Sequence, residues 1–232
     1  MRTRARGFNL LEVVVSCVLL STAMLCAFEF FEFGSRVFRG GLMRQGLQAQ
    51  VRRSVTPLDQ DLRRTDLSTV SVIAKAQDAT REILSTSGAL VERDGLCLAA
   101  LSNWNLGTNY DTLTSRPMWD RYVVYYATTE AEGARLIRQT VRPPGSPYLS
   151  NWGVFTTATS LSQNPALNSG PIENTRVLAD QVEEFHVVLD APTSAVIVKV
   201  KFRATGGLRV GTAGKNLDES LEANFQIHPE NS

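Results

Sequence analysis

The sequence predicts an α+β protein: one long N-terminal α-helix, transmembrane at its start, packed against a C-terminal head of antiparallel β-strands. Apolar residues dominate 8–28, with a single charged residue among them. Apolar residues then recur at helical spacing as far as residue 64. Further along, apolar and polar residues alternate in short runs, which is typical of strands. We therefore expect a membrane-spanning segment at 8–28, an amphipathic stalk at 29–64 and a β-rich head at 65–232.

The overall composition is that of an ordinary globular protein. The chain has 232 residues, 43% of them hydrophobic and 20% charged, which argues against wholesale disorder. With 24 basic and 23 acidic residues, the net charge of +1 gives no strong indication of a nucleic-acid binder. Cys17 and Cys26 lie in the apolar segment, and Cys97 is the only cysteine of the head. An intramolecular disulfide within the head is therefore excluded.

The charges that flank the apolar segment predict its orientation. Three arginines lie within residues 2–6, before the segment, and Glu29 and Glu32 follow it. Between Val13 and Phe28 there is no charged residue. Positive charge is retained on the cytoplasmic side of a membrane helix, so we expect a cytoplasmic N-terminus and a head outside the cytoplasmic membrane.

Two ordinary export signals fit this segment poorly. A secretory signal peptide needs a small-x-small cleavage site after its apolar run, and residues 27–29 (Ala-Phe-Glu) do not supply a good one. Residues 14–17 (Val-Val-Ser-Cys) loosely resemble a lipoprotein signal. However, the apolar stretch before Cys17 is short and contains Glu12, and the apolar run continues well beyond it.

A third interpretation rests on the residues around Gly7. A short arginine-rich leader, residues 1–7, ends in Gly7; Phe8 follows, and Glu12 is the fifth residue after the glycine. This arrangement resembles the processing motif of type IV prepilins and implies a pilin-like fold in the bacterial inner membrane. The resemblance implies cleavage by a prepilin peptidase between Gly7 and Phe8, followed by N-methylation of Phe8.

Glu12 is the one acidic residue inside the apolar segment. A carboxylate within a membrane span costs about 2.5–3.5 kcal/mol on insertion scales, so its presence predicts a partner. The resemblance implies that this partner is the methylated amine of Phe8 in an adjacent subunit, and that Glu12 thereby fixes the axial register of assembly. The alternative is that Glu12 extends toward the cytoplasmic interface, near the leader arginines.

The stalk is expected to be a helix with interruptions. Leu47, Val51, Val55 and Leu58 recur at helical spacing, and Glu32 and Arg36 form an i,i+4 pair. Glycine costs about 1 kcal/mol in a helix interior and proline removes a backbone donor. We therefore expect a kink or restart at Pro57. The glycines, which are a hypothetical point of local melting when the subunit enters a filament, are Gly34, Gly40, Gly41 and Gly46.

Seven runs of the head are predicted as strands, joined by turns and by loops rich in Asn, Ser, Gly and Pro. Residues 121–128 and 135–141 form a hairpin, and 182–189 pairs with 195–204 across a turn at 190–193. Alternation within 195–204 predicts one buried and one wet face. The remaining predicted strands are 69–73, 96–101 and the edge strand 221–227. The long loops are 143–151 and 163–174. The tryptophans that flank such loops are Trp104, Trp119 and Trp152. We expect the tryptophans to pack over a small core; the alternative is a contact surface for a partner subunit.

The head also resembles one branch of the pilin family. Five segments occur in the order seen in the larger minor pilins and pseudopilins of the J/W type: 53–64, 120–126, 136–138, 177–185 and 195–202. The resemblance implies a low-copy component at the tip or at initiation of a filament. The lack of a disulfide-forming cysteine pair departs from many major pilins.

The sequence contains no convincing catalytic, metal or cofactor site. His186 and His228 have no Cys or His at metal-ligand spacing, and we expect both to be structural. Residues 211–216 hint at a phosphate-binding loop but lack its first glycine and its Ser/Thr. A calcium site from Asp111, Asp120 or Asp190 is not favoured by their spacing. Seven basic residues could form a face for DNA, but no aromatic residues that could stack on bases are interleaved with them, so we expect a solvated face. They are Arg52, Arg53, Arg63, Arg64, Lys199, Lys201 and Arg203.

These features predict a non-enzymatic assembly subunit. The resemblance implies a minor pilin or pseudopilin of a type IV pilus, a type II secretion pseudopilus or a competence system. Its expected partners are prepilin peptidase, other pilins through the N-terminal helix, the inner-membrane assembly platform and the lipid bilayer. An adhesive or DNA-capturing tip module is the alternative, although the sequence does not support DNA binding. A membrane-anchored enzyme is a third alternative.

Overall fold

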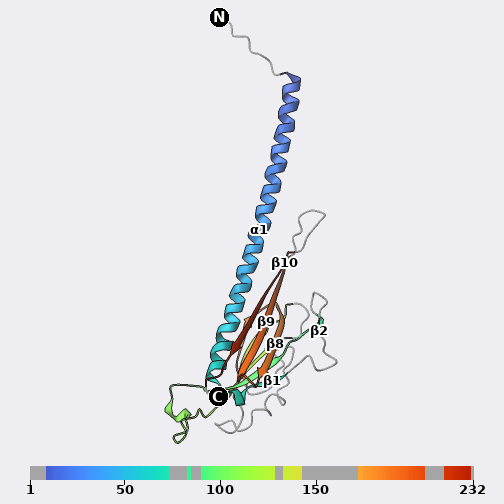
Figure 1. The fold of residues 1–232 in the computed structure, drawn as a ribbon. Coiled ribbons are helices and arrows are strands. Elements are labelled where there is room, and N and C mark those ends of the chain that lie inside the picture. The colour runs from blue at the N-terminus through green and yellow to red at the C-terminus, as the bar shows by residue number, and fades with distance from the viewer. Residues whose placement is uncertain are drawn as a thin grey trace. The chain divides into compact units, whose positions relative to one another are not determined.

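The computed structural model describes residues 9–73, 83–84, 90–128, 133–142, 172–206 and 217–230 (Figure 1). The chain divides into two compact units, Met1–Arg44 and Gln45–Ser232, and one helix runs through both. Several features named above fall outside the described residues: Gly7, Phe8, Trp152, the loop 143–151, most of the loop 163–174, and residues 211–216.

The long helix α1 runs without a break from Leu10 to Arg64. The expected interruptions in the stalk are therefore wrong. Pro57 removes one backbone hydrogen bond and costs about 3 kcal/mol. Leu58, the next residue, and Leu62, one turn later, are 1% and 0% exposed. Burial of each leucine contributes roughly 1.5–3 kcal/mol. The packing of these two side chains therefore offsets the proline.

The glycines of α1 also leave the helix intact. A Cβ built on Gly34, Gly41 or Gly46 would meet no atom within 4 Å, so these residues are not required by close packing. Their neighbours include leucine, methionine, arginine and glutamine, which are strong helix formers. The cost of about 1 kcal/mol for each glycine is thus distributed over a helix that is otherwise favoured locally.

Two antiparallel sheets and a short hairpin form the β-rich part of the second unit. The five-stranded sheet has the order β1-β4-β5-β6-β7, and the three-stranded sheet has the order β10-β9-β8. The short hairpin pairs β2 with β3. The bounds are β1 Ser71–Ile73, β2 Ile83–Leu84, β3 Leu90–Val91, β4 Gly95–Ala100, β5 Arg121–Ala127, β6 Leu136–Val141, β7 Ile172–Ala179, β8 Val182–Asp190, β9 Ala195–Gly206 and β10 Leu217–Ile227.

The expected hairpins are confirmed. β5 pairs with β6, β8 pairs with β9 across a turn at 191–194, and β10 is an edge strand of its sheet. In β9 the expected alternation is also confirmed, because Val198 and Phe202 are 0% exposed whereas Ile197 is 36% exposed. These strands carry a period-two pattern that the burial of one face explains.

Two strand predictions needed correction. The strand expected at 69–73 begins only at Ser71, because Leu67–Thr69 form a 3-10 turn. The side chain of Asp66 caps that turn by accepting a hydrogen bond from the backbone N–H of Ser68 at 2.8 Å. Strand β7 was missed, and its first residues fall in the expected loop 163–174. Its exposed polar stretch carries little apolar alternation.

The five-stranded sheet buries side chains on both of its faces. Leu96, Tyr125 and Arg138 are paired across three neighbouring strands and so lie on one face. On the other face, Cys97 and Val124 belong to a buried apolar cluster. The first face is the one that the end of α1 contacts, through Asp61. The architecture, an N-terminal helix packed against antiparallel sheets, agrees with the fold class expected from the sequence.

Candidate functional site

Glu12 lies in the first turn of α1 and forms part of its N-terminal cap. The backbone N–H of Asn9 donates to Oε2 of Glu12 at 3.2 Å, and the backbone N–H of Glu12 donates to the carbonyl of Asn9 at 2.9 Å. The bond to the Glu12 side chain is one of the two bonds of a capping box, and an acidic side chain is favoured at a helix N-terminus. The residues of the expected cleavage site, Gly7 and Phe8, lie outside the described residues, so the structure locates Glu12 alone of the three.

The first part of α1 presents apolar side chains in all directions. Between Leu10 and Phe38, the exposed large apolar side chains have relative exposures of 47–82%. This helix is long and apolar enough to cross a membrane, the property expected from the sequence. The hydroxyls of Ser21 and Thr22 donate to backbone carbonyls one turn earlier, both at 2.8 Å. The two hydroxyls are therefore satisfied within the helix, as a lipid environment requires.

Asp61 connects the end of α1 to the five-stranded sheet. Its Oδ2 accepts hydrogen bonds from the hydroxyl of Tyr125 and from Nε of Arg138, the latter at 2.8 Å. Nη1 of Arg138 donates to Thr140 at 3.2 Å. Burial raises the pKa of Tyr125 well above its usual value, and the Asp61 carboxylate raises it further. Tyr125 is therefore a neutral hydrogen-bond donor throughout the physiological pH range.

A second polar cluster joins the segment before β4 to β8. The backbone of Arg93 forms a parallel bridge with Phe185. Nδ1 of His186 contacts Oδ2 of Asp94 at 2.9 Å and also contacts Oε2 of Glu92. The prediction that His186 is structural missed these carboxylates, because 92 residues separate Asp94 from His186. No sequence motif connects the two segments.

Asp94 is the buried member of this cluster, at 2% exposed. Burial raises the pKa of its carboxyl, while the backbone N–H of Val187, at 2.9 Å, and the neighbouring His186 act in the opposite direction. Burial is the larger effect. Among the described residues, no group of three or more His, Cys, Asp or Glu side chains is arranged to hold a metal ion.

The three aspartates considered for calcium are used in separate turns. Oδ1 of Asp111 accepts hydrogen bonds from the backbone N–H groups of Leu113 and Thr114, which lower the pKa of Asp111. Oδ1 of Asp120 accepts from the backbone N–H of Ser102 at 2.8 Å. Asp190 accepts from the hydroxyl of Thr193 at 2.6 Å. Asp111 and Asp190 thus stabilise their own turns, whereas Asp120, directly before β5, bonds to a residue 18 positions earlier, after β4.

Among the basic residues considered for DNA binding, the three on β9 form ion pairs within the head. Lys199 contacts Glu184 at 3.0 Å, and Lys201 contacts Glu183 at 3.0 Å. Arg203 contacts Glu183 at 3.3 Å and also pairs with Asp218, which raises the pKa of Arg203. The positive charge of β9 is therefore compensated by acids of β8 and β10, which reduces its attraction for a polyanion.

Trp104 and Trp119 pack together, as expected. Their ring centroids are 5.9 Å apart at an interplanar angle of 72°, an edge-to-face arrangement. They cover a small cluster that contains Leu101. Cys97 is 1% exposed, and burial raises its pKa to about 12. The thiol therefore remains protonated, and its packing indicates a structural role.

Neither a scan against models of known protein families, nor a search of curated proteins, nor a search of solved structures found a match to this chain.

Proposed function

We propose that this chain is a minor pilin or pseudopilin, a non-enzymatic subunit that helps to initiate or cap a type IV pilus or a type II secretion pseudopilus. One combined observation carries the proposal. Gly7, Phe8 and Glu12 stand at prepilin spacing at the start of a continuous helix, whose first turn contains Glu12. That helix is apolar at its start and buried at its end. A signal peptide alone would not need the buried second part.

In this proposal the two parts of α1 have different tasks. The apolar part anchors the subunit in the bacterial inner membrane, with a cytoplasmic N-terminus and a periplasmic or extracellular head. The part beyond Gln45 holds the head, since Leu47, Leu58 and Leu62 are buried there. Release of the leader would leave Phe8 as the new N-terminus, four residues before Glu12.

In this proposal the charge of Glu12 fixes the axial register between neighbouring subunits. After cleavage, its carboxylate would pair with the methylated amine of Phe8 on an adjacent subunit. A charge pair inside a membrane is strongly favoured over an unpaired carboxylate, so helices that slide out of register lose stability. The exposed carboxylate in the first turn supports this assignment, because only the backbone N–H of Asn9 is bonded to it among the described residues.

Processing is the direct test. We expect intact-mass analysis and N-terminal sequencing of protein from a strain with prepilin peptidase to find a chain that begins with methylated Phe8. Gly7→Val should block cleavage. Gly34→Val is the matched control, because Gly34 lies within α1 and a Cβ added there would meet no atom within 4 Å. An unmethylated chain that begins at Met1, or a lipidated Cys17, would overturn the proposal.

Assembly is the second test. Glu12→Ala should leave cleavage intact while strongly reducing incorporation into filaments. Glu29→Ala removes the same charge from the same helix, outside the expected register position, and serves as the control. Equal incorporation of the two variants would contradict the assigned role of Glu12. A deletion strain that assembles normal filaments, but loses adhesion or transformation, would favour a binding module instead.

A further inference from the structure

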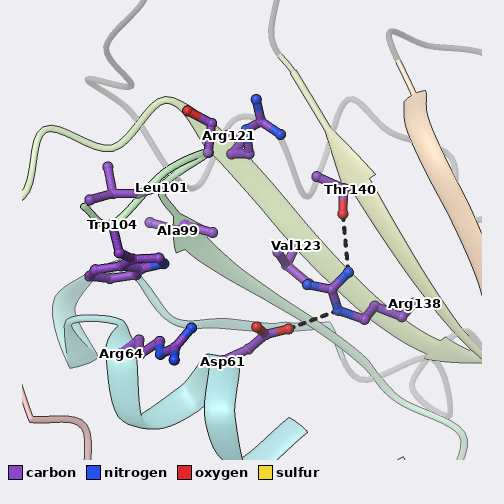
Figure 2. Close-up of a pocket in the computed structure, with 11 residues that line it drawn as sticks. Asp61, Arg64, Ala99, Leu101, Trp104, Arg121, Val123, Arg138 and Thr140 are labelled. Atoms are coloured by element: carbon purple, nitrogen blue, oxygen red, sulfur yellow. Dashed lines mark hydrogen bonds and ion pairs between the residues drawn. The ribbon is translucent and has the colours of Figure 1, made fainter. Parts of the chain in front are cut away.

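A polar cavity lies where the end of α1 meets the five-stranded sheet (Figure 2). Its ionic groups are engaged within the protein, because Arg138 pairs with Asp61 and Arg121 pairs with Glu173. Arg64, the third arginine of the lining, lies over an indole ring. The three-stranded sheet, in contrast, ends in a strand with an open edge.

Strand β10 forms this open edge (Figure 1). It covers Leu217–Ile227, contains no proline, and keeps a continuous register with β9 without a bulge. The opposite edge, β8, is partly covered: the N–H of Phe185 donates to the carbonyl of Glu92 at 2.9 Å, and the N–H of Asp94 donates to the carbonyl of Phe185 at 2.7 Å. Folded proteins often protect an edge by shortening it, by a bulge or by proline, and β10 has none of these protections.

The bonds of β8 determine which backbone groups of β10 point outward. In an antiparallel sheet, residues on one face direct their N–H and C=O groups to one neighbouring strand, and residues on the other face direct theirs to the opposite side. Phe185 and Val187, on the buried face of β8, direct their N–H groups away from β9, toward Glu92 and Asp94. The buried face of β9 therefore bonds to β10, and the wet face of β10 directs its N–H and C=O groups away from the sheet.

The outward backbone groups of β10 are open to an additional strand. The residues that carry them are Asp218, Ser220, Glu222, Asn224 and Gln226. All of these residues are exposed, and on this side none has a backbone hydrogen bond to a residue that the structure describes. A row of unpaired N–H and C=O groups is a template for pairing with another chain.

The buried face of the sheet is incomplete at the same edge. In β9, Val198 and Phe202 are 0% exposed. Their register partners on β10, Phe225 and Leu221, are only half-buried, as is Ala223 between them. A strand added beyond β10 with apolar side chains on this face would therefore extend the core that β9 begins.

The charge of β10 indicates the chemistry of such a strand. Asp218, Glu219 and Glu222 lie in β10, which contains no basic residue. Glu222 has no ion pair with a described residue, and its Oε1 accepts a hydrogen bond from the side-chain amide of Asn224 at 2.9 Å. Opposite charges on neighbouring strands attract each other and like charges repel. The wet face of an added strand is therefore expected to be basic.

Strand β9 already shows a sequence that fits beside β10. Lys199 and Lys201 lie on its wet face, and the latter is the register partner of Glu222. Val198 and Val200 alternate with these lysines on the buried face. Basic and apolar residues thus alternate in the strand that covers the inner side of β10.

We propose that the free edge of β10 binds an extended segment of a partner protein, as an antiparallel strand in which basic and apolar residues alternate as they do in β9. Main-chain hydrogen bonds supply the affinity, and the alternating side chains supply the selectivity. A second copy of this chain fits less well, because two β10 strands would bring acidic residues together. The proposal goes beyond the assembly role proposed above and does not depend on it.

Two synthetic peptides test this edge without altering the protein. Both have the sequence of residues 196–203, Val-Ile-Val-Lys-Val-Lys-Phe-Arg, with a fluorescent label. In an added antiparallel strand, the wet positions, Lys199 and Lys201, direct their N–H groups to β10, whereas Val198 and Val200 direct theirs away. One peptide is therefore N-methylated at the two valines, which also prevents self-association, and the other at the two lysines.

Fluorescence anisotropy with the full chain in a nonionic detergent compares the two peptides, which have the same composition and charge. The valine-methylated peptide should bind, and the lysine-methylated peptide should bind roughly tenfold or more weakly, because it lacks two donors to β10. Equal affinities, a preference for the lysine-methylated peptide, or no binding of either at about 1 mM would overturn the proposal.

A variant of β10 locates the binding site. Asn224→Pro removes an outward N–H and leaves the bonds to β9 in place, as proline at an edge does. It should weaken binding of the valine-methylated peptide roughly fivefold or more, whereas Asn224→Ser, which keeps the N–H, should retain it. Thermal unfolding checks that both variants fold, and the comparison of peptides on wild type stands whatever its result. A wild-type dimer in sedimentation that Asn224→Pro abolishes would assign the edge to a second copy and overturn the proposal.

Discussion

Replacing Asp61 with alanine should loosen the attachment of α1 to the five-stranded sheet. The carboxylate accepts from Tyr125, which is 0% exposed, and from Arg138. Its removal leaves a phenolic donor without its acceptor and a guanidinium, 23% exposed, without its counter-charge. Breaking a fully buried pair costs about 3–5 kcal/mol. Because both side chains of this pair retain some exposure, we expect a loss of about 2–4 kcal/mol.

The matched control is Asp59→Ala, two residues earlier on the same helix. Asp59 pairs with Arg63 at 2.9 Å, a distance close to that of the Asp61–Arg138 pair. However, the Asp59–Arg63 pair lies along the helix, and its side chains are 35% and 51% exposed. An exposed i,i+4 pair contributes about 0.3–0.5 kcal/mol. Burial and the connection to a second element are therefore the differences that the comparison isolates.

Thermal unfolding of the full chain in detergent, followed by tryptophan fluorescence, measures both variants. At about 2–4 °C per kcal/mol for a unit of this size, Asp61→Ala should lower the Tm by about 5–15 °C and Asp59→Ala by about 1–2 °C. Near-equal decreases for the two variants would refute the assignment of Asp61 as the attachment point. A normal Tm for Asp61→Ala would show that the helix is held by its leucines alone.

Two further predictions concern the interior of the head. Burial raises the pKa of Asp94, so ionised Asp94 destabilises the fold increasingly as the pH rises above its ordinary value of 3.8. The stability of Asp94→Asn relative to wild type should therefore increase from about pH 4 upward in urea titrations, and a difference that is constant or decreases with pH contradicts this. Phe202→Ala should cost about 3–5 kcal/mol because the ring is 0% exposed, whereas Ile197→Ala, on the wet face of β9, should cost less than about 1 kcal/mol. Similar losses in the same titrations would show that β9 is buried on both faces.

Local sequence patterns were sufficient to predict the membrane-length helix and the strand hairpins, because the spacing of apolar residues along the chain specifies these elements. The apolar run before Phe28 predicts a membrane-length helix, because every backbone group of a helix is satisfied within the segment itself. The alternation in β9 predicts its buried and wet faces, because successive side chains of a strand point to opposite sides. Its hairpin with β8 follows from the intervening turn. Glu12 stands out for a similar reason, as a charge inside an apolar segment.

The sequence by itself therefore determined the long helix, the hairpins and the residues of the proposed processing site. Only the tertiary structure decided that α1 continues through Pro57, because the burial that offsets the proline comes from packing on the sheets. The tertiary structure also brings Asp61 into contact with Tyr125 and Arg138, which are 64 and 77 residues away. The same packing forms the arginine-lined cavity. Contacts between distant segments follow from strand order and register, and no local pattern of residues encodes those.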